Sequence, residues 1–246
     1  MITLTDGRKE GLLSGNQLKI LAALFMIVDH VGALFFPGII GPMGWMRYVG
    51  RLSFPIFAFF IAEGCRYTQN RARYLGVLSL MGLVFHLVYY YVVGDETLNV
   101  IVTFTMGVAL VYAWQNALFF CREKRVFGAV IGFVLFFGYG FLCYEICKAV
   151  HVDYRFGGVI LPWLVYLTKK KWMRLFFFAL GIVVVAIGMG EESAVEAWGL
   201  LSVPIMALYS GERGKMRMKY FFYLFYPIHL VVLYGIWLLV NSGRLW

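Results

Sequence analysis

Residues 18–36 have the sequence LKILAALFMIVDHVGALFF, in which Lys19, Asp29 and His30 are the ionisable side chains. A helix needs about 20 predominantly apolar residues to cross a bilayer core of about 30 Å, and this stretch has that length. Comparable stretches recur because 62% of the 246 residues are hydrophobic and only 14% are charged. Soluble domains carry about 25% charged residues. The sequence therefore predicts an all-α, polytopic transmembrane helix bundle and excludes an ordinary soluble domain.

Charged breaks divide the chain into about nine predicted spans, of which the sixth is too short to cross comfortably. The spans are residues 18–36, 51–66, 72–93, 98–120, 126–148, 156–168, 172–189, 194–209 and 218–241. Glycines at 128, 132, 138 and 140 predict close helix packing in the fifth span. We expect one integral-membrane domain over residues 1–246, with residues 1–14 as a short polar cytoplasmic leader.

The charge distribution predicts the orientation of the spans. The chain has 22 Lys and Arg against 13 Asp and Glu, a net charge of +9. The basic residues gather in alternate connections, around Arg71, Arg125, Lys170 and Lys215, whereas the third and seventh connections are acidic. Cytoplasmic loops of membrane proteins carry this excess of Lys and Arg. We therefore predict a bacterial cytoplasmic membrane protein with its N-terminus inside and its C-terminus outside, and no nucleic-acid partner.

The cysteines predict neither a disulfide framework nor a metal site. Cys65, Cys121, Cys143 and Cys147 fall in or beside apolar runs and have no C-x-x-C spacing. Both kinds of site normally show such spacing or a secreted context.

Ionisable residues inside predicted spans are candidates for a functional site, because they are costly in lipid and usually face the bundle interior. They are Asp29, His30, Glu63, His86, Glu145 and His229. The predicted topology puts His30 and His86 in the outer half of the bilayer. We expect an outer cluster there that also contains Arg51, Asn99, Asp153 and Tyr154. The Tyr226-Pro227-x-His229 segment adds an imidazole just past a helix break. We assign Asp153, Tyr154, Tyr226 and His229 to a chamber that holds the acceptor.

Lys19 and His30 share one face of the first span, about 16 Å apart along the axis. One ligand can therefore contact both, with a phosphate near Lys19 and with His30 as general base. Asp29 points elsewhere and is expected to pair with Arg51 or with a second histidine. The alternative for each histidine is a structural hydrogen bond to a neighbouring helix.

An inner group of basic and polar residues is expected to bind the phosphates of a cytoplasmic nucleotide cofactor. It comprises Glu63, Arg66, Thr68, Asn70, Arg71, Arg73, Arg213, Gly214 and Lys215. Together with Lys19 they form the predicted binding site, with Lys19, Arg66 and Arg213 or Lys215 nearest the phosphates. Positions 63, 66 and 70 share one helical face. The alternative is that these arginines only mark the cytoplasmic side.

Several segments together resemble the TraX family over nearly the whole chain. They are Leu18 to Gly32, Arg51 to Phe59 with Glu63-Gly64, Tyr67 to Asn70, Leu98-Asn99 with Thr103 and Gly107, Asp153-Tyr154 with Gly157-Gly158, Tyr209 to Gly214, and Tyr220 to Leu230. The resemblance implies N-terminal acetylation of pilin, and a distant likeness to the membrane acyltransferase-3 group implies acetyl-CoA as donor. In that group a basic residue and a histidine are separated by ten residues in the first helix, as Lys19 and His30 are here. The group more often has arginine at the first position. Lys19 lacks the planar guanidinium with which that arginine would bind a phosphate through two hydrogen bonds.

We therefore expect a membrane acyltransferase that moves an acetyl group from acetyl-CoA to an amine or hydroxyl acceptor, such as a pilin N-terminus or a surface glycan or lipid. His30 is the expected base, Asp29 its orienting carboxylate, and Arg51 or Asn99 the oxyanion donor, with His86 as a further catalytic candidate. A transporter that relays protons through buried Asp and His is the first alternative. A non-catalytic assembly factor of a conjugation or surface apparatus is the second.

Overall fold

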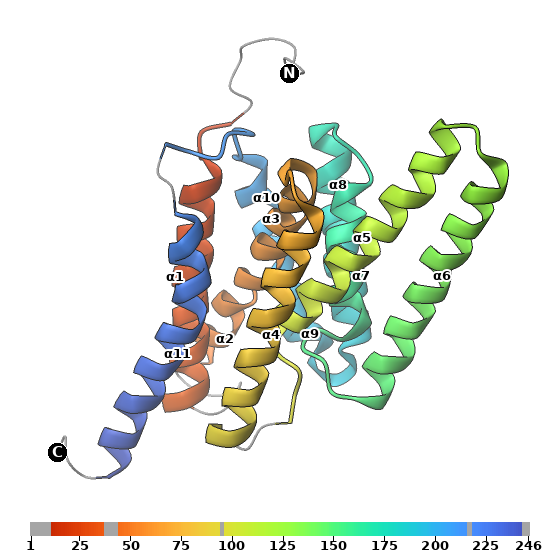
Figure 1. Ribbon diagram of the computed structural model, residues 1–246. Coiled ribbons are helices and arrows are strands. Elements are labelled where there is room, and N and C mark those ends of the chain that lie inside the picture. The colour runs from red at the N-terminus through yellow and green to blue at the C-terminus, as the bar shows by residue number, and fades with distance from the viewer. Residues whose placement is uncertain (1–10, 37–43, 94–95, 216–217, 243–246) are drawn as a thin grey trace. The chain divides into compact units, whose positions relative to one another are not determined.

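A computed structural model describes residues 11–36, 44–93, 96–215 and 218–242, and it places most of them in helices (Figure 1). The helices are α1 (Gly15–Phe35), α2 (Trp45–Gly50), α3 (Ser53–Tyr67), α4 (Arg71–Val93), α5 (Val100–Arg122), α6 (Val126–Ala149), α7 (Arg155–Tyr166), α8 (Lys171–Gly188), η1 (Gly190–Glu192), α9 (Ser193–Glu196), η2 (Ala197–Leu201), α10 (Ser202–Ala207) and α11 (Lys219–Asn241). Within these ranges the only extended pairings are two isolated β-bridges. The predicted all-α membrane bundle is confirmed.

Seven stretches of the described chain are long and apolar enough to cross a membrane. They are Gly15–Phe35, Trp45–Tyr67, Arg71–Tyr91, Val100–Arg122, Val126–Ala149, Lys171–Gly188 and Leu224–Asn241. The predicted sixth span is α7, which has only 12 residues. The predicted eighth span, 194–209, was wrong as a continuous helix, because short 3₁₀ and α segments succeed one another there. Within this stretch Ser202 Oγ donates to the Gly199 carbonyl at 2.6 Å.

The contacts of the chain group it into two compact units. We call residues 1–57 with 198–246 the terminal unit and residues 58–197 the central unit. Helix α3 begins in the first and ends in the second.

In the terminal unit, α1 packs against α2 and α11 (Figure 1). Ser14 and Gln17 form a capping box that starts α1. The chain just before α1 bonds to the chain around residue 209, since the Leu13 amide donates to the Leu208 carbonyl at 2.9 Å and the Ser210 amide to the Leu13 carbonyl at 2.9 Å. The start of α1 and the predicted eighth connection therefore lie at one end of this unit, as the predicted topology requires.

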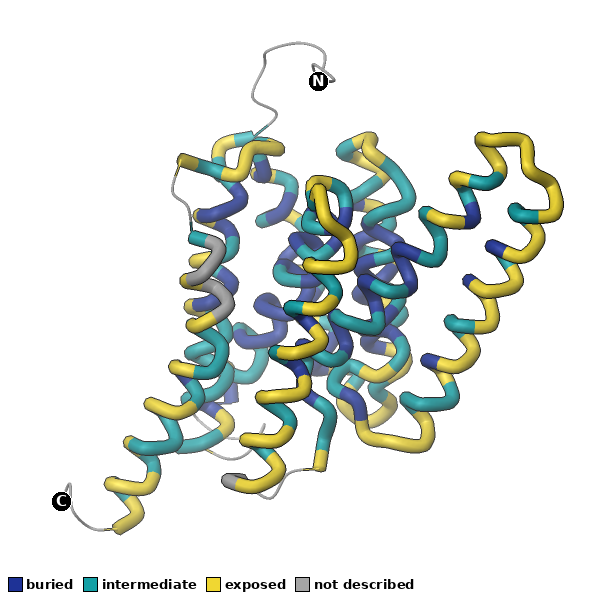
Figure 2. The backbone as a smooth tube through the Cα atoms, in the orientation of Figure 1, coloured by how far each residue is buried: buried dark blue, intermediate teal, exposed yellow. Residues whose placement is uncertain are grey.

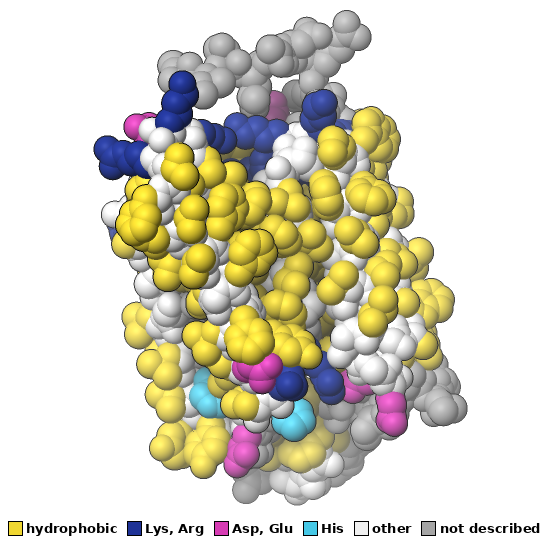
Figure 3. All heavy atoms as spheres, turned by 90° about the vertical axis from the view of Figure 1, so that its right-hand side faces the viewer, with side chains coloured by type: hydrophobic (Ala, Val, Ile, Leu, Met, Phe, Trp, Pro, Cys, Tyr) yellow, Lys and Arg dark blue, Asp and Glu magenta, His cyan; other side chains and the backbone are white. Residues whose placement is uncertain are grey.

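In the central unit, α5 packs against α4, α6 and α7, and α7 packs against α8. Many buried residues line α5, α7 and the part of α3 in this unit, whereas α6 is exposed along most of its length (Figure 2). The exposed side of α6 is apolar: Phe127 is 80% exposed and Phe137 is 67% exposed. Figure 3 shows hydrophobic side chains over most of this face. An apolar face of this kind is suited to lipid and not to water.

In the central unit, the connections between predicted spans contact one another in two pairs. The third and fifth meet through the Leu98–Val152 bridge, in which the Leu98 amide donates to the His151 carbonyl at 2.8 Å. The second and sixth meet where Arg66 donates to the carbonyl of Thr168. Odd connections thus gather with odd ones and even with even ones, which is the alternation that the charges predict.

Helix α6 approaches α5 closely at two of its glycines. A Cβ atom at Gly132 would lie 2.7 Å from Cα of Ala117, and one at Gly128 would lie 2.8 Å from the Phe120 ring. The prediction of close packing is confirmed at these two positions. It was wrong at Gly138, where nothing lies within 4 Å.

Replacing Gly132 by alanine is expected to lower the free energy of unfolding by about 1–3 kcal/mol, the usual penalty of overpacking. Gly138→Ala is the matched control and is expected to be neutral or to stabilise by up to about 1 kcal/mol through helix propensity. Thermal unfolding midpoints in detergent measure both, and equal midpoints would contradict the close α5–α6 contact.

Cysteines introduced singly at positions 151 and 170 of a cysteine-free protein test the topology. Both positions are exposed, and they belong to an odd and an even connection. We expect an impermeant maleimide to label position 151 in intact cells and position 170 only after permeabilisation. Labelling of both positions in intact cells would refute the predicted orientation.

Candidate functional site

Asp29 forms an ion pair between α1 and α2 in the terminal unit. Its Oδ1 lies 2.8 Å from Nη1 of Arg47 and 3.8 Å from Nη2 of Arg51. The Asp29 side chain is 16% exposed, and a carboxylate in such surroundings needs a cationic partner. Arg51 was predicted and is confirmed as a partner. Arg47 was missed, although its spacing of four residues from Arg51 puts both on one helix face.

Two glycines permit this approach of α2 to α1. A Cβ atom at Gly50 would overlap the Asp29 side chain, and one at Gly32 would lie 2.8 Å from Cβ of Met46. Side chains at either position would push the helices apart and lengthen the ion pair.

His30 of α1 and His229 of α11 meet edge to face, with ring centroids 5.0 Å apart and an interplanar angle of 75°. Phe225 stacks on His229 at 4.9 Å and 9°, and the Tyr226 ring lies 5.8 Å from it. His229 is only 7% exposed. His229 therefore lies beside His30, and Tyr226 lies beside His229.

A backbone carbonyl orients each imidazole. Nδ1 of His30 lies 2.8 Å from the Met26 carbonyl oxygen, and Nδ1 of His229 lies 2.8 Å from that of Phe225. Because a carbonyl oxygen can only accept, we assign the proton of each neutral ring to Nδ1, which leaves the lone pair on Nε2. Asp29 was expected to orient His30, and this was wrong: Met26 orients the ring, while the Asp29 carboxylate binds the arginines.

Nε2 of His229 is buried and has no hydrogen-bond partner among the described residues. Buried polar atoms in proteins are nearly always paired, so an unpaired one in a packed helix is a candidate functional atom. In both rings the unprotonated nitrogen is therefore Nε2. The pair presents two acceptor nitrogens between two apolar helices.

Basic residues lie at the start of α1, the other end of the helix that carries His30. The Asn16 amide donates to the Arg213 carbonyl at 3.0 Å, and the Gly15 amide to the Glu212 carbonyl at 2.8 Å. Arg213 and Lys215 are exposed. The predicted proximity of this loop to the Lys19 end of α1 is confirmed, so an anionic group bound there would face exposed cations.

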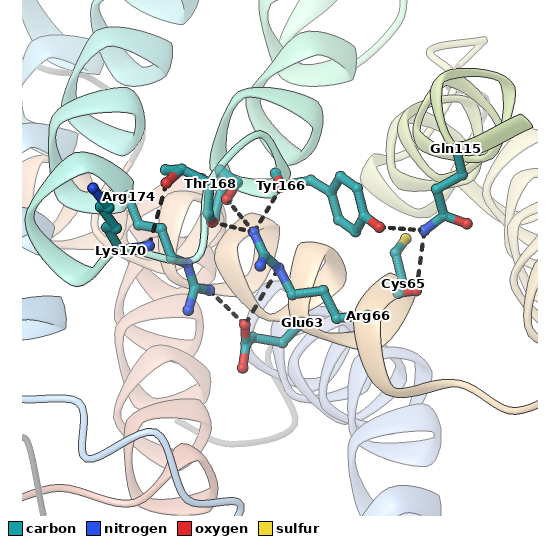
Figure 4. A network of polar contacts seen from close by, with 9 residues as sticks. Glu63, Cys65, Arg66, Gln115, Tyr166, Thr168, Lys170 and Arg174 are labelled. Carbon is teal, nitrogen blue, oxygen red and sulfur yellow. Dashed lines mark hydrogen bonds and ion pairs between the residues drawn. The ribbon is translucent and has the colours of Figure 1, made fainter. Parts of the chain in front are cut away.

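Arg66 performs a structural role in the central unit (Figure 4). Its guanidinium donates to the carbonyls of Val165 at 3.0 Å, Tyr166 at 2.7 Å and Thr168, and it stacks 4.9 Å from the Tyr166 ring. These are the orphan carbonyls at the C-terminus of α7. The prediction that Arg66 binds cofactor phosphates is therefore corrected: its donors cap a helix.

Glu63 completes this network through Arg174, which sequence reasoning missed. Nη2 of Arg174 lies 2.5 Å from Oε1 of Glu63, Nε of Arg66 lies 3.9 Å from the same oxygen, and the Arg174 guanidinium covers the Phe59 ring at 4.4 Å. Glu63 is 6% exposed. We therefore move Glu63 as well from the cofactor set to the scaffold.

Asn70 and Asn99 are helix caps. Oδ1 of Asn70 accepts from the Arg73 amide at 2.8 Å, and Oδ1 of Asn99 accepts from the amides of Ile101 at 3.0 Å and Val102 at 3.3 Å. The Asn99 amide group also donates to the Gly82 carbonyl at 3.0 Å. Both predicted ligand roles are corrected, because these groups already satisfy backbone atoms. Arg71 stays exposed, 5.7 Å above the Tyr112 ring.

The remaining members of the predicted outer cluster lie in the central unit. The Asp153 carbonyl accepts from Thr103 Oγ1 at 2.7 Å, and Tyr154 begins α7 in a left-handed conformation with φ of 60°. The His86 ring lies 6.4 Å from that of Tyr90, and its buried Nδ1 has no hydrogen-bond partner in the described ranges. These contacts give His86 no base or nucleophile partner.

No group of three or more His, Cys, Asp or Glu side chains that could hold a metal occurs in the part of the chain that the structure describes. All four cysteines are free thiols.

Replacing Arg66 by alanine is expected to reduce the folded yield, because it leaves the α7 carbonyls and part of the Glu63 charge without a partner. Breaking a buried ion pair destabilises by about 3–5 kcal/mol. Arg73→Ala removes an exposed side chain and is the control, with an expected change of less than about 0.5 kcal/mol. Size-exclusion profiles and unfolding midpoints in detergent measure the difference, and equal stability of the two variants would contradict the capping role.

Comparisons with known proteins place the chain in a family. It is 25% identical over 242 residues to a Dichelobacter nodosus protein named Probable fimbrial assembly protein FimC, serogroup H1, covering 89% of this chain and 94% of that one. It is 25% identical over 105 residues to Uncharacterized protein RP591 of Rickettsia prowazekii (strain Madrid E), covering 42% of this chain and 38% of that one. No solved structure matches. The model described as TraX protein matches residues 14–237, which include both members of the histidine pair, and the chain therefore belongs to the TraX family.

Proposed function

We propose that this protein is an integral-membrane acetyltransferase that moves an acetyl group from cytoplasmic acetyl-CoA to an amine or hydroxyl acceptor at the membrane. The observation that carries the proposal is the pair of adjacent imidazoles, one half-buried and one buried, each with Nδ1 fixed by a carbonyl and Nε2 left as an acceptor. Transfer to an amine or hydroxyl requires removal of its proton, and a neutral imidazole does this near neutral pH.

His30 is the general base of this proposal. It is the less buried of the two rings, and we therefore assign the removal of the acceptor proton to it. The fixed tautomer contributes to catalysis, because the base needs no rearrangement before it takes the proton.

Arg51 is the proposed hydrogen-bond donor to the oxyanion of the tetrahedral intermediate. Its guanidinium is held near Asp29, one residue before His30, and its side chain is 9% exposed. A guanidinium in low-dielectric surroundings stabilises the negative oxygen of a tetrahedral intermediate more strongly than it would in water.

The donor is proposed to bind at the start of α1. Lys19 lies about 16 Å along the helix axis from His30, and Arg213 and Lys215 are exposed in the adjoining loop. Phosphates of coenzyme A complement this charge, and the acetyl thioester has to extend from there toward the histidines. Contacts of this kind weaken with salt. The cytoplasmic placement of this end follows from the positive-inside pattern.

The name of one relative gives an indication of the chemical class of the acceptor. The Dichelobacter relative is named as a fimbrial assembly protein, which favours an exported pilin-like polypeptide with a free amine as acceptor. The same name favours a second candidate function, a membrane factor that assists fimbrial assembly without chemistry.

Protein in nanodiscs is to be incubated with labelled acetyl-CoA and amine-bearing or hydroxyl-bearing acceptors, and thiol release and acceptor labelling are followed. We expect label on the acceptor. Folded protein that transfers no label to any acceptor would favour the assembly factor and contradict the acetyltransferase.

His30→Gln is expected to lower turnover by about 10²- to 10⁴-fold, the range of general-base catalysis. This loss corresponds to about 3–5 kcal/mol in the transition state at 1.36 kcal/mol per tenfold. Glutamine keeps much of the volume but cannot take a proton near neutral pH. His151→Gln, at an exposed position, is the matched control and should keep full turnover. Retention of more than about a tenth of turnover by His30→Gln at equal abundance would remove His30 as base.

A further inference from the structure

The two histidines differ in a way that a single general base does not explain. His229 is 7% exposed, stacked on Phe225, and its Nε2 has no partner in the described part of the chain. Leaving a buried polar atom unpaired costs about 1–3 kcal/mol. A second ring with an open lone pair against His30 therefore calls for a role of its own.

We propose that His229 is the nucleophile that carries the acetyl group, so that transfer proceeds in two steps through an N-acetylimidazole at Nε2 of His229. This inference rests on the proposed function and specifies its mechanism. The fixed Nδ1–H on the Phe225 carbonyl leaves Nε2 as the atom that attacks.

In the first step the Nε2 lone pair of His229 attacks the thioester carbonyl carbon of acetyl-CoA. The carbon–sulfur bond breaks, coenzyme A leaves as a thiolate, and the acetylated ring carries one positive charge with its proton still on Nδ1. The charges of the thiolate and of the imidazolium balance.

In the second step the acceptor amine attacks the acetyl carbon, and Nε2 of His30 takes the amine proton. The bond between Nε2 of His229 and the acetyl carbon breaks, and its electron pair returns to the ring. His30 then loses its proton to solvent, where the thiolate of coenzyme A takes one up, so the products are the acetylated acceptor and free coenzyme A.

Burial decides which ring has which role. An acylated imidazole is hydrolysed by water, so the acyl carrier belongs on the ring that excludes water. The acceptor has to reach the general base, so the base belongs on the ring that the protein encloses less. His229 is buried and His30 is half-buried. The ring centroids lie 5.0 Å apart, which brings the base beside the acyl group that the acceptor attacks.

Isotope exchange without acceptor tests the proposal, because a two-step enzyme exchanges labelled coenzyme A into acetyl-CoA when no acceptor is present. Wild type and His151→Gln in nanodiscs should show both exchange and transfer. His30→Gln should keep exchange and lose transfer. His229→Gln should lose both, with exchange reduced by about 10²-fold or more, the scale for losing an essential catalytic group.

A second measurement needs no variant. Wild type is to be quenched after incubation with labelled acetyl-CoA alone, and the label is mapped by mass spectrometry, with hydroxylamine as the reagent that releases acyl-imidazole. We expect label on His229. This arm decides the question if His229→Gln proves unable to fold.

The outcomes separate the two claims. Transfer by wild type without exchange or label on His229, or exchange that survives in His229→Gln, would overturn the acyl carrier and leave the acetyltransferase standing. Label on His30 instead would also overturn the assignment. Absence of both exchange and transfer in folded wild type would overturn the proposed function together with this inference.

Discussion

The ion pair between Asp29 and Arg47 is the interaction on which the terminal unit depends. A carboxylate in the middle of a membrane helix has no water to solvate it and has to be matched from inside the protein. Arg47 at 2.8 Å and Arg51 at 3.8 Å provide the match, and Gly50 leaves the space for it. Since His30 is the next residue along α1, the pair also fixes the height and rotation of the proposed base beside α11.

A related constraint explains why many polar residues of the central unit are not ligands. The backbone groups at a helix end have no partners within the helix and have to find them elsewhere. Arg66 supplies donors to the end of α7, Asn70 caps α4 and Asn99 caps α5. At His229 a buried acceptor atom has no hydrogen-bond partner among the described residues, but the same is true of Nε of Arg66 and Nε of Arg174 in the scaffold. What distinguishes the histidine pair is the contact between two imidazole rings, with centroids 5.0 Å apart and each Nδ1 held by a backbone carbonyl.

Composition and span length were enough to predict the helical bundle, and charge alternation agrees with how the connections meet in each unit. The interruption at 190–207 was missed because mean apolarity does not report where an apolar run divides into several short helices. Asp29, His30 and His229 were found because ionisable residues in apolar runs are conspicuous. Arg47 was missed because it precedes the predicted second span. The roles of Arg66 and Asn99 could not be predicted, since helix capping across the chain depends on which carbonyls and amides the fold brings near.

A double-mutant cycle on Asp29 and Arg47 tests most directly whether their pair holds the terminal unit together. Asp29→Asn and Arg47→Gln alone should each lower the unfolding midpoint in detergent, because each leaves a buried charge with fewer partners. The double variant should be more stable than the sum of the two losses, with a coupling energy of about 0.5–3 kcal/mol. Strictly additive losses would show that Asp29 and Arg47 act independently and would contradict the central place given to their contact.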